Sequence, residues 1–124
     1  MEQVWCAADP GEVVHPDGFA AQLEGGIIYG LTAALYGEIS IDGGRVVERN
    51  FPDYPMVKMA DAPKISVEVV ASGARTGGAG EPGTPPTAAA LANAVFAATG
   101  RRVRELPLRK HDLRAPLEPE RKLG

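Results

Sequence analysis

Apolar side chains recur at every fourth position between residues 19 and 35, and this spacing predicts an amphipathic helix. The repeating positions are Phe19, Leu23, Ile27, Leu31 and Leu35. A second series with the same spacing, Gln22, Gly26 and Gly30, forms a stripe of nearly bare backbone with an amide side chain at its beginning. Each glycine costs a helix interior ~1 kcal/mol relative to alanine, so we expect another part of the molecule to pack very close to this stripe.

A second helix is predicted in the alanine-rich stretch that follows residue 84. Its apolar positions again have a helical spacing: Leu91, Ala92, Val95, Phe96 and Ala98. Thr84 is a suitable N-cap, and Pro85 or Pro86 fits the first helical turn, where a missing N–H has no cost. Gly100 is a suitable C-terminal stop. The sequence therefore gives this helix both a start and an end.

Short strands are predicted on either side of the helices. The segments with strand patterns are residues 4–8, 65–69 and 103–108. Residues 38–41 and 45–47 flank Asp42-Gly43-Gly44, which predicts a β-hairpin with a short glycine turn. The order strand, helix, hairpin, strand, glycine-rich loop, helix, strand indicates an α+β fold with a mixed sheet and two main helices.

The folded unit is predicted to comprise residues 1–111. Residues 112–124 are charged and broken by prolines, which is typical of a disordered tail. The first strand begins almost at Met1 without a preceding turn or cap, so we expect the chain to be one piece of a larger unit.

Composition and charge narrow the classes of function. The 124 residues (13.0 kDa) are enough for one domain at most, and a net charge of -3 provides no basic surface for nucleic acid. No apolar run approaches the ~18 residues that cross a bilayer, so no membrane contact is predicted. The N-terminus lacks a signal-peptide pattern, which leaves a cytoplasmic or a periplasmic location open. The single cysteine, Cys6, excludes an internal disulfide and lies in an apolar run typical of core residues.

The strongest candidate for chemistry is the glycine-rich loop at residues 76–86. Glycines remove side chains where a backbone turns sharply or where something large comes close, and this loop holds Gly77, Gly78, Gly80 and Gly83. Glu81 is the only ionisable residue inside the loop. We therefore interpret the loop as a structure that presents Glu81.

Three interpretations of this loop are open. It can be a tight strand-to-helix connection with a solvated carboxylate. It also satisfies the G-x-G-x-x-G dinucleotide pattern, with Glu105 about 20 residues further on. Two residues argue against nucleotide binding. Pro82 removes a backbone N–H that would bind the pyrophosphate, and Glu81 would place a negative charge beside this anionic ligand. In the third interpretation Glu81 is a general base that approaches a metal-bound oxygen unobstructed.

Three long segments carry a family resemblance. GGAGEPGTPPTAAALANAVFAATGRRVRELPL, ADPGEVVHPDGFAAQLEGGIIYGLTAALYGEI and NFPDYPMVKMADAPKISVEV resemble the C-terminal part of the large subunit of molybdenum hydroxylases. The similarity is greatest to the isoquinoline 1-oxidoreductase beta subunit and related aldehyde dehydrogenases, in the group of xanthine dehydrogenase and aldehyde oxidase. It covers about residues 4 to 110 in one collinear run, so residues 1–111 resemble a C-terminal molybdopterin-binding subdomain.

The resemblance implies roles for individual residues. Glu81 matches the family's glutamate beside the molybdenum, which is no metal ligand but takes the proton from a metal-bound hydroxide. The resemblance thus implies no metal ligand in this chain. Gln22 matches a glutamine near the cofactor, and Gly26 fits a close approach to the cofactor about as well as tight helix packing. Gly78, Ala79 and Gly80 are expected to give the cofactor side of the loop its clearance.

Cofactors and partners are likewise implied by the resemblance. The cofactor is molybdopterin with molybdenum, expected in a cytosine dinucleotide form and held mostly by other chains. The expected partners are the remaining part of the large subunit and a small subunit with [2Fe-2S] clusters. The substrate is a small molecule hydroxylated with oxygen from water, either an N-heterocycle or an aldehyde.

A function of another class stays open. The family's large subunit is several times longer than this chain, so the lone chain is expected to be inactive. It can instead be a non-catalytic stand-alone domain, a relic or an interaction module. The apolar faces of both predicted helices are expected to cover a larger core, so an isolated chain should expose apolar area or self-associate.

Overall fold

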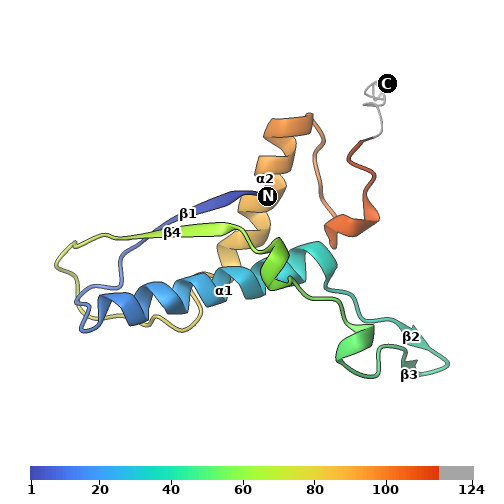
Figure 1. Cartoon of the computed structure of the whole chain (residues 1–124), viewed down its shortest axis with the longest axis horizontal. Helices are drawn as coiled ribbons and strands as arrows, with labels where there is room; N and C mark the ends of the chain where they lie inside the picture. Colours follow the sequence, from blue (N-terminus) through green and yellow to red (C-terminus); the bar gives the residue numbers. More distant parts are fainter. Residues whose placement is uncertain (115–124) are drawn as a thin grey trace, which may run out of the picture.

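The computed structural model describes residues 1–114, whose regular structure consists of helices and short strands (Figure 1). The helices are α1 (Pro16–Tyr36) and α2 (Pro85–Thr99), and the strands are β1 (Gln3–Ala8), β2 (Ile41–Asp42), β3 (Arg45–Val46) and β4 (Lys64–Val69). Both predicted helices, the hairpin and the strands at residues 4–8 and 65–69 are confirmed, although the hairpin strands are shorter than predicted. The tail predicted at residues 112–124 lies, from residue 115 onward, outside the described residues.

Strands pair in two separate sheets of two strands each. β1 and β4 are parallel, with Val4 opposite Ile65, and α1 forms the crossover between them. β2 and β3 are antiparallel, with Asp42 opposite Arg45, so the turn consists of Gly43 and Gly44 alone. Both glycines have positive φ, as a two-residue hairpin turn requires. The α+β prediction with two main helices is confirmed, and its parallel and antiparallel pairs lie in different sheets.

The core lies along one stripe of α1. The buried apolar side chains of this helix are Phe19, Leu23, Ile27, Leu31 and Ala34. They recur at nearly the spacing predicted from the sequence and contact β4 and α2. At the start of the helix, Nδ1 of His15 accepts a hydrogen bond from the N–H of Gly18 at 2.8 Å. Elements of the same chain cover this face of α1, so the apolar area that an isolated chain is expected to expose does not lie here.

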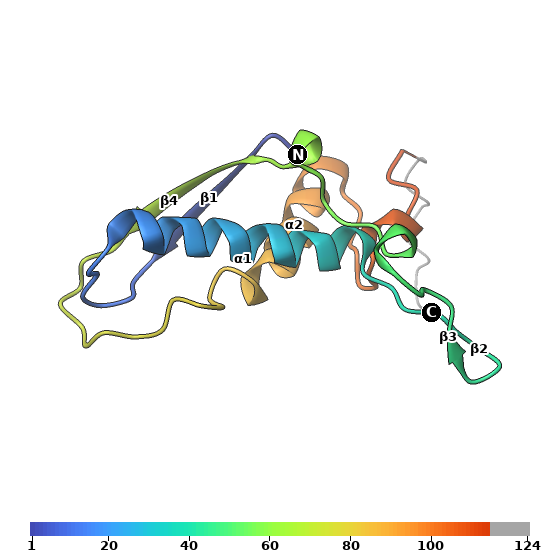
Figure 2. The ribbon, with the colours of Figure 1, turned by 60° about the horizontal axis from the view of Figure 1, so that its bottom comes forward.

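The glycine stripe of α1 packs against the first turn of α2, where the two helices cross (Figure 2). A Cβ atom on Gly30 would lie 2.9 Å from the carbonyl oxygen of Thr84 and 2.9 Å from Cβ of Thr87. On the other side of the contact, a Cβ atom on Gly83 would lie 2.7 Å from the carbonyl oxygen of Leu23. The predicted close approach is therefore confirmed, and at Gly30 its partner is the protein itself.

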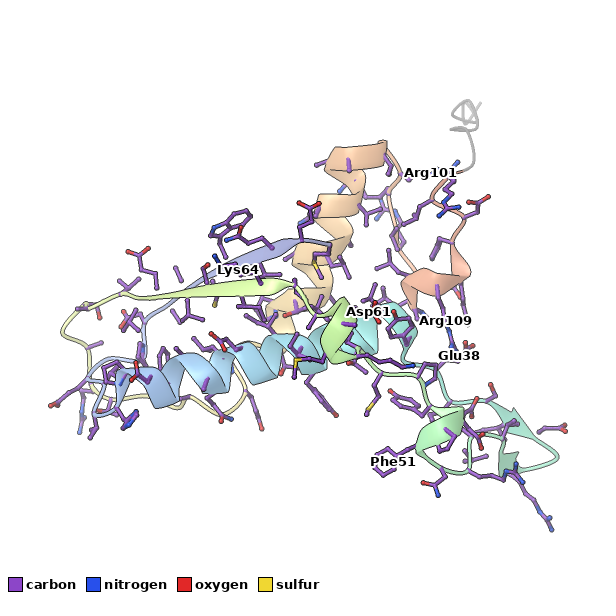
Figure 3. The ribbon with its side chains drawn as sticks, viewed as in Figure 1. Glu38, Phe51, Asp61, Lys64, Arg101 and Arg109 are labelled. Atoms are coloured by element: carbon purple, nitrogen blue, oxygen red, sulfur yellow. The ribbon has the colours of Figure 1, made fainter. Side chains whose placement is uncertain are left out.

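The strand predicted at residues 103–108 is wrong. This segment is irregular and ends in a single 3-10 turn, Leu108–Lys110, that packs against α1. Pro107 has no N–H for a strand ladder, and burying Pro107 and Leu108 against the helix replaces strand pairing. The turn is also held by charge, because Glu38, just beyond α1, pairs with Arg109 at 3.1 Å and with Lys110 (Figure 3).

Candidate functional site

The glycine-rich loop is attached to the turn that follows β1. The N–H of Val70 donates to the carbonyl of Ala8 at 2.9 Å, and the N–H of Gly77 donates to the carbonyl of Pro10 at 2.7 Å. Gly11 in the same turn has φ +74°, and a Cβ atom there would lie 2.7 Å from the carbonyl oxygen of Ala74. The Asp-Pro-Gly turn therefore supports the loop through backbone contacts that a side chain would prevent.

Asp9 strengthens this attachment. A hydrogen bond from Ser72 is the largest cause that lowers the pKa of the Asp9 carboxyl, and the N–H of Gly11, 3.1 Å from Oδ1, is the second. Both donors favour the ionised form of the carboxylate. The carboxylate is thus held between the turn after β1 and the beginning of the loop.

Further along, the loop is attached to α1 on both sides of Glu81. Nε2 of Gln22 donates to the carbonyl of Gly80 at 3.1 Å, and Oγ1 of Thr84 donates to the carbonyl of Gly26 at 3.0 Å. The N–H of Thr84 also donates to the carbonyl of Glu81 at 2.8 Å, which closes a tight turn. The backbone of Glu81 is therefore fixed on α1.

A shallow depression of about 460 Å³ lies where this turn meets α1. It is lined by Gln22, Gly25, Gly26, Tyr29, Gly80, Glu81, Thr84 and Pro85. The side chain of Glu81 is exposed, and among residues 1–114 it has no hydrogen-bond or ion-pair partner. The depression thus combines an unengaged carboxylate with an amide, a phenol and a hydroxyl group.

The structure brings four of the predicted site residues together: Gln22, Gly26, Gly80 and Glu81 all line the depression. Gly78 and Ala79 precede it on the loop and do not line it. A Cβ atom on Gly78 or Gly80 would meet nothing within 4 Å, so these positions are open to an approaching group. Cofactor binding by these residues stays a prediction.

Thr84 has a different role from the predicted cap. It occupies the N-cap position of α2, but its side chain makes no capping hydrogen bond and its backbone is helical (φ -80°, ψ -53°). Its hydroxyl instead donates to Gly26 on α1. The capping prediction is wrong because Thr84 lacks the extended backbone of a cap, Pro86 has no N–H, and the N–H of Thr87 points to the carbonyl of Thr84 instead.

Tyr29 was missed by sequence reasoning. Its side chain is 71% exposed and lines the depression. It lies seven residues after Gln22, two helical turns further along the same face of α1. This spacing was a usable signal, but a lone tyrosine on a helix carries no motif.

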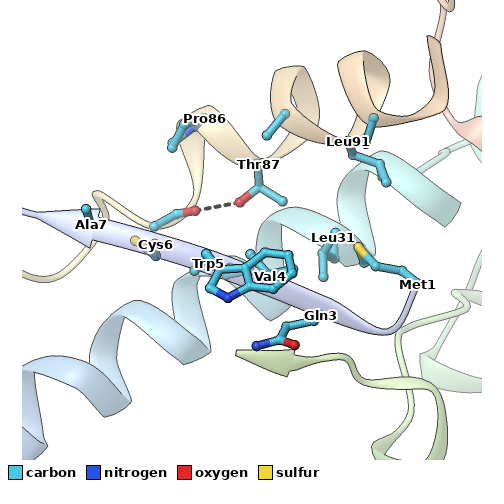
Figure 4. A pocket seen from close by; sticks show the side chains of 14 residues that line it. Met1, Gln3, Val4, Trp5, Cys6, Ala7, Leu31, Pro86, Thr87 and Leu91 are labelled. Atoms are coloured by element: carbon cyan, nitrogen blue, oxygen red, sulfur yellow. Dashed lines mark hydrogen bonds between the residues drawn. The ribbon is translucent and has the colours of Figure 1, made fainter. Parts of the chain in front are cut away.

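A second, apolar hollow of about 430 Å³ lies between β1 and α2 (Figure 4). Its walls include Val4, Cys6, Ala90, Leu91 and Ala94, and none of its lining side chains is charged. Trp5 lies at its rim and is 74% exposed. Cys6 is half-buried here, so the prediction of a core cysteine is met only in part.

The described residues contain neither a metal-binding cluster nor a membrane-spanning helix. Within residues 1–114, no three histidine, cysteine, aspartate or glutamate side chains gather closely enough to bind a metal ion. In the same part of the chain, neither helix combines the length and apolar character needed to cross a membrane.

Comparisons with known proteins point in one direction. The molybdopterin cofactor-binding domain family matches residues 1–63. The chain is 40% identical to isoquinoline 1-oxidoreductase subunit beta of Brevundimonas diminuta over 109 aligned residues. This alignment covers 88% of the chain. It is also 40% identical to the membrane-bound pyrroloquinoline-quinone aldehyde dehydrogenase of Gluconacetobacter polyoxogenes over 105 aligned residues. This alignment covers 85% of the chain.

A solved structure has the same fold. Quinoline 2-oxidoreductase from Pseudomonas putida 86 superposes with a TM-score of 0.74 over 82% of this chain, at 23% sequence identity. The chain spans only 14% of that protein's length and 14% of the length of each of the two relatives above.

Proposed function

This chain belongs to the family of molybdopterin cofactor-binding domains, within the large subunits of molybdenum hydroxylases, and on that premise we propose that Glu81 is the general base of such an enzyme. The proposal rests on how Glu81 is held. The backbone on both sides of Glu81 is fixed on α1, whereas the carboxylate is exposed and has no hydrogen-bond or ion-pair partner among the described residues. A base needs this combination, because it must be held in place and still be free to accept a proton.

The residues around Glu81 fit a large polar cofactor. The depression offers hydrogen-bonding groups on Gln22, Tyr29 and Thr84, and Gly80 leaves its edge open. We propose that Gln22, Gly26 and Gly80 lie against the cofactor, with Gly78 and Ala79 giving clearance. When bound, molybdopterin supplies a redox-active molybdenum that activates water and takes up the two electrons of the hydroxylation.

In this proposal the chain contributes proton transfer and placement. An oxygen of the Glu81 carboxylate accepts the proton of the attacking water-derived oxygen. Gly78 and Gly80 have no side chains and open space beside them, so a bound cofactor can approach the backbone of the loop. Gly30 has no part in cofactor binding, since Thr84 and Thr87 occupy the space beside it.

The wider assembly is proposed from the relatives. The matching relative from Brevundimonas diminuta is the beta subunit of isoquinoline 1-oxidoreductase. We propose that this chain works with the remaining part of a large subunit and with a small subunit that carries [2Fe-2S] clusters. The cofactor is proposed in its cytosine dinucleotide form. The substrate is an N-heterocycle or an aldehyde, the compound classes in the names of the two relatives.

The test is a Glu81→Gln substitution in the complex purified with its cofactor. We expect turnover to fall by about 10²- to 10⁴-fold, because the amide cannot accept the proton, while molybdenum and pterin contents stay unchanged. Glu12→Gln, at an exposed carboxylate away from the depression, should keep full turnover. Full turnover of the Glu81→Gln enzyme would remove Glu81 from the mechanism.

A further inference from the structure

Two hydrogen bonds hold the segment that contains Glu81 to a single face of α1. The amide of Gln22 reaches the carbonyl of Gly80, and the hydroxyl of Thr84 reaches the carbonyl of Gly26. Gln22 and Gly26 are one helical turn apart, about 6 Å along the axis. Gly80 and Thr84 are likewise four residues apart and enclose Glu81. The turn therefore lies alongside α1 with an anchor at each end.

The hydroxyl of Thr84 is free for this contact because the start of α2 does not use it. A threonine at an N-cap ordinarily accepts a hydrogen bond from the second or third helical N–H. Here Pro85 and Pro86 have no N–H, and the N–H of Thr87 lies 3.3 Å from the carbonyl of Thr84. With a helical backbone at Thr84, and with no N–H on Pro86, the hydroxyl makes no bond within its own helix and donates to α1.

The bond also depends on the missing side chains of α1. A Cβ atom on Gly26 would lie 3.4 Å from Oγ1 of Thr84, and one on Gly30 would lie 2.9 Å from the carbonyl oxygen of Thr84. Thr84 therefore fits between two glycines spaced by one turn. A side chain on Gly30 would force Thr84 or its neighbours to shift, whereas a methyl group on Gly26 would make an ordinary contact with the threonine hydroxyl.

We propose that Thr84 and Gln22 are positioning residues that fix the backbone on both sides of Glu81 and so aim its carboxylate. The carboxylate has no side-chain partner of its own within residues 1–114, so its place is set by the backbone alone. The catalytic consequence of this inference rests on the proposed role of Glu81. Its structural consequence, a loop held still by two side chains, does not.

The experiment compares variants of both anchors in the purified complex. Thr84→Val removes the hydroxyl at nearly constant volume, Thr84→Ser keeps it, and Gln22→Met removes the exposed amide without entering the core. Thr99→Val is the matched control, because its hydroxyl bonds Val95 at the far end of α2. Amide hydrogen exchange of residues 77–84 is measured by mass spectrometry together with kcat, KM and metal content.

We expect Thr84→Val and Gln22→Met each to speed exchange in this peptide by about tenfold, as loss of one net hydrogen bond implies. Thr84→Val should lower kcat by about 10- to 100-fold at constant KM and metal content, because a misplaced base loses much of its effect. Gln22→Met should lower kcat at least as much, and because Gln22 is also proposed to lie against the cofactor, its kcat is expressed per bound molybdenum. Thr84→Ser and Thr99→Val should match the parent protein. Unchanged exchange in both Thr84→Val and Gln22→Met overturns the inference.

A double substitution separates positioning from general structural damage. In a Glu81→Gln enzyme the aimed carboxylate is already gone, so adding Thr84→Val should cause no further loss of the residual rate. An equal loss in both backgrounds would show that Thr84 acts on something other than Glu81, and the inference would be wrong. If Glu81→Gln alone keeps full turnover, the proposed function fails, and the exchange measurement still decides whether the two anchors hold the loop.

Discussion

The two helices have similarly apolar sequences but very different surroundings. α1 buries an unbroken stripe from Phe19 to Ala34, whereas in α2, all of whose residues are described, only Thr87 is buried. After its first turn α2 leaves α1 and projects away from it (Figure 1). Phe96 in α2 is 37% exposed, and the guanidinium of Arg102 lies 3.6 Å from the centre of its ring. An amphipathic pattern therefore predicts a helix without telling whether the same chain covers its apolar face.

The difference between the helices bears on the proposed site. The turn that carries Glu81 is anchored to α1, the well-packed helix, and it leads directly into α2, the poorly packed one. The proposed base is thus attached to the helix that the same chain covers, and not to the exposed one. The apolar hollow beside α2, with Met1 and Trp5 exposed at its edge, is one of several apolar surfaces of the chain, since Ile41, Val46 and Phe51 are exposed elsewhere.

The largest expected effect compares one leucine from each helix. Leu31 in α1 is 1% exposed, so Leu31→Ala should reduce the free energy of unfolding by about 2–5 kcal/mol through lost burial and an unfilled cavity. Leu91 in α2 is only half-buried, and Leu91→Ala should cost about 1 kcal/mol or less. Urea unfolding of both variants measures the two values.

Equal losses for the two leucines would contradict the comparison. They would mean that α2 is covered in solution, as self-association of the chain would do. Sedimentation of the parent chain over a range of concentrations distinguishes this cause, because a loss at Leu91 should then shrink as the chain is diluted.

A smaller effect is expected where the helices touch. Gly30→Ala adds a methyl group 2.9 Å from Thr84 and Thr87, and such overpacking costs about 1–3 kcal/mol. The gain in helix propensity offsets about 1 kcal/mol, so the net loss should be about 0–2 kcal/mol. Gly25→Ala is the control, since nothing lies within 4 Å of its Cβ, and it should stabilise the chain by about 0.5–1 kcal/mol. Urea unfolding of both variants gives the difference, and a Gly30→Ala chain as stable as Gly25→Ala would contradict the packing.

Sequence reasoning succeeded where a local pattern determines the structure. The four-residue spacing of α1 predicted its buried side, and the glycine stripe predicted a close contact there. The partner of that stripe could not be predicted, because Gly30 meets Thr84 and Thr87 from a segment more than fifty residues away in sequence. The role of Thr84 was missed for the same reason: local rules assign a threonine before Pro-Pro to a cap.

The site was predicted unevenly on the same grounds. Glu81 was found because the glycine-rich loop isolates a single carboxylate, and Gln22 because its segment resembles a known motif. Tyr29 was missed because only the packed helix shows that it shares a depression with Glu81. The false strand at residues 103–108 arose because a short segment with several apolar residues does not reveal that Pro107 and Leu108 are buried against α1.

The smallest expected effect concerns the C-terminal turn, Leu108–Lys110, which packs against α1. Hydrogen bonds from Lys110 and then from Arg109 hold the pKa of the Glu38 carboxyl below its ordinary value. A lowered pKa in the folded state means that the stabilisation is complete above the ordinary pKa and is lost as the pH falls through the lowered one. Glu38→Gln should therefore lower the urea midpoint slightly at pH 7, the difference should shrink as the pH falls through the acidic range, and high salt should shrink it as well. The control is Glu12→Gln. The carboxylate of Glu12 has no ion-pair partner among residues 1–114, so this substitution should show no such pH dependence.

A Glu38→Gln midpoint equal to that of the parent at pH 7 would mean that burial of Pro107 and Leu108 alone holds the C-terminal turn on α1.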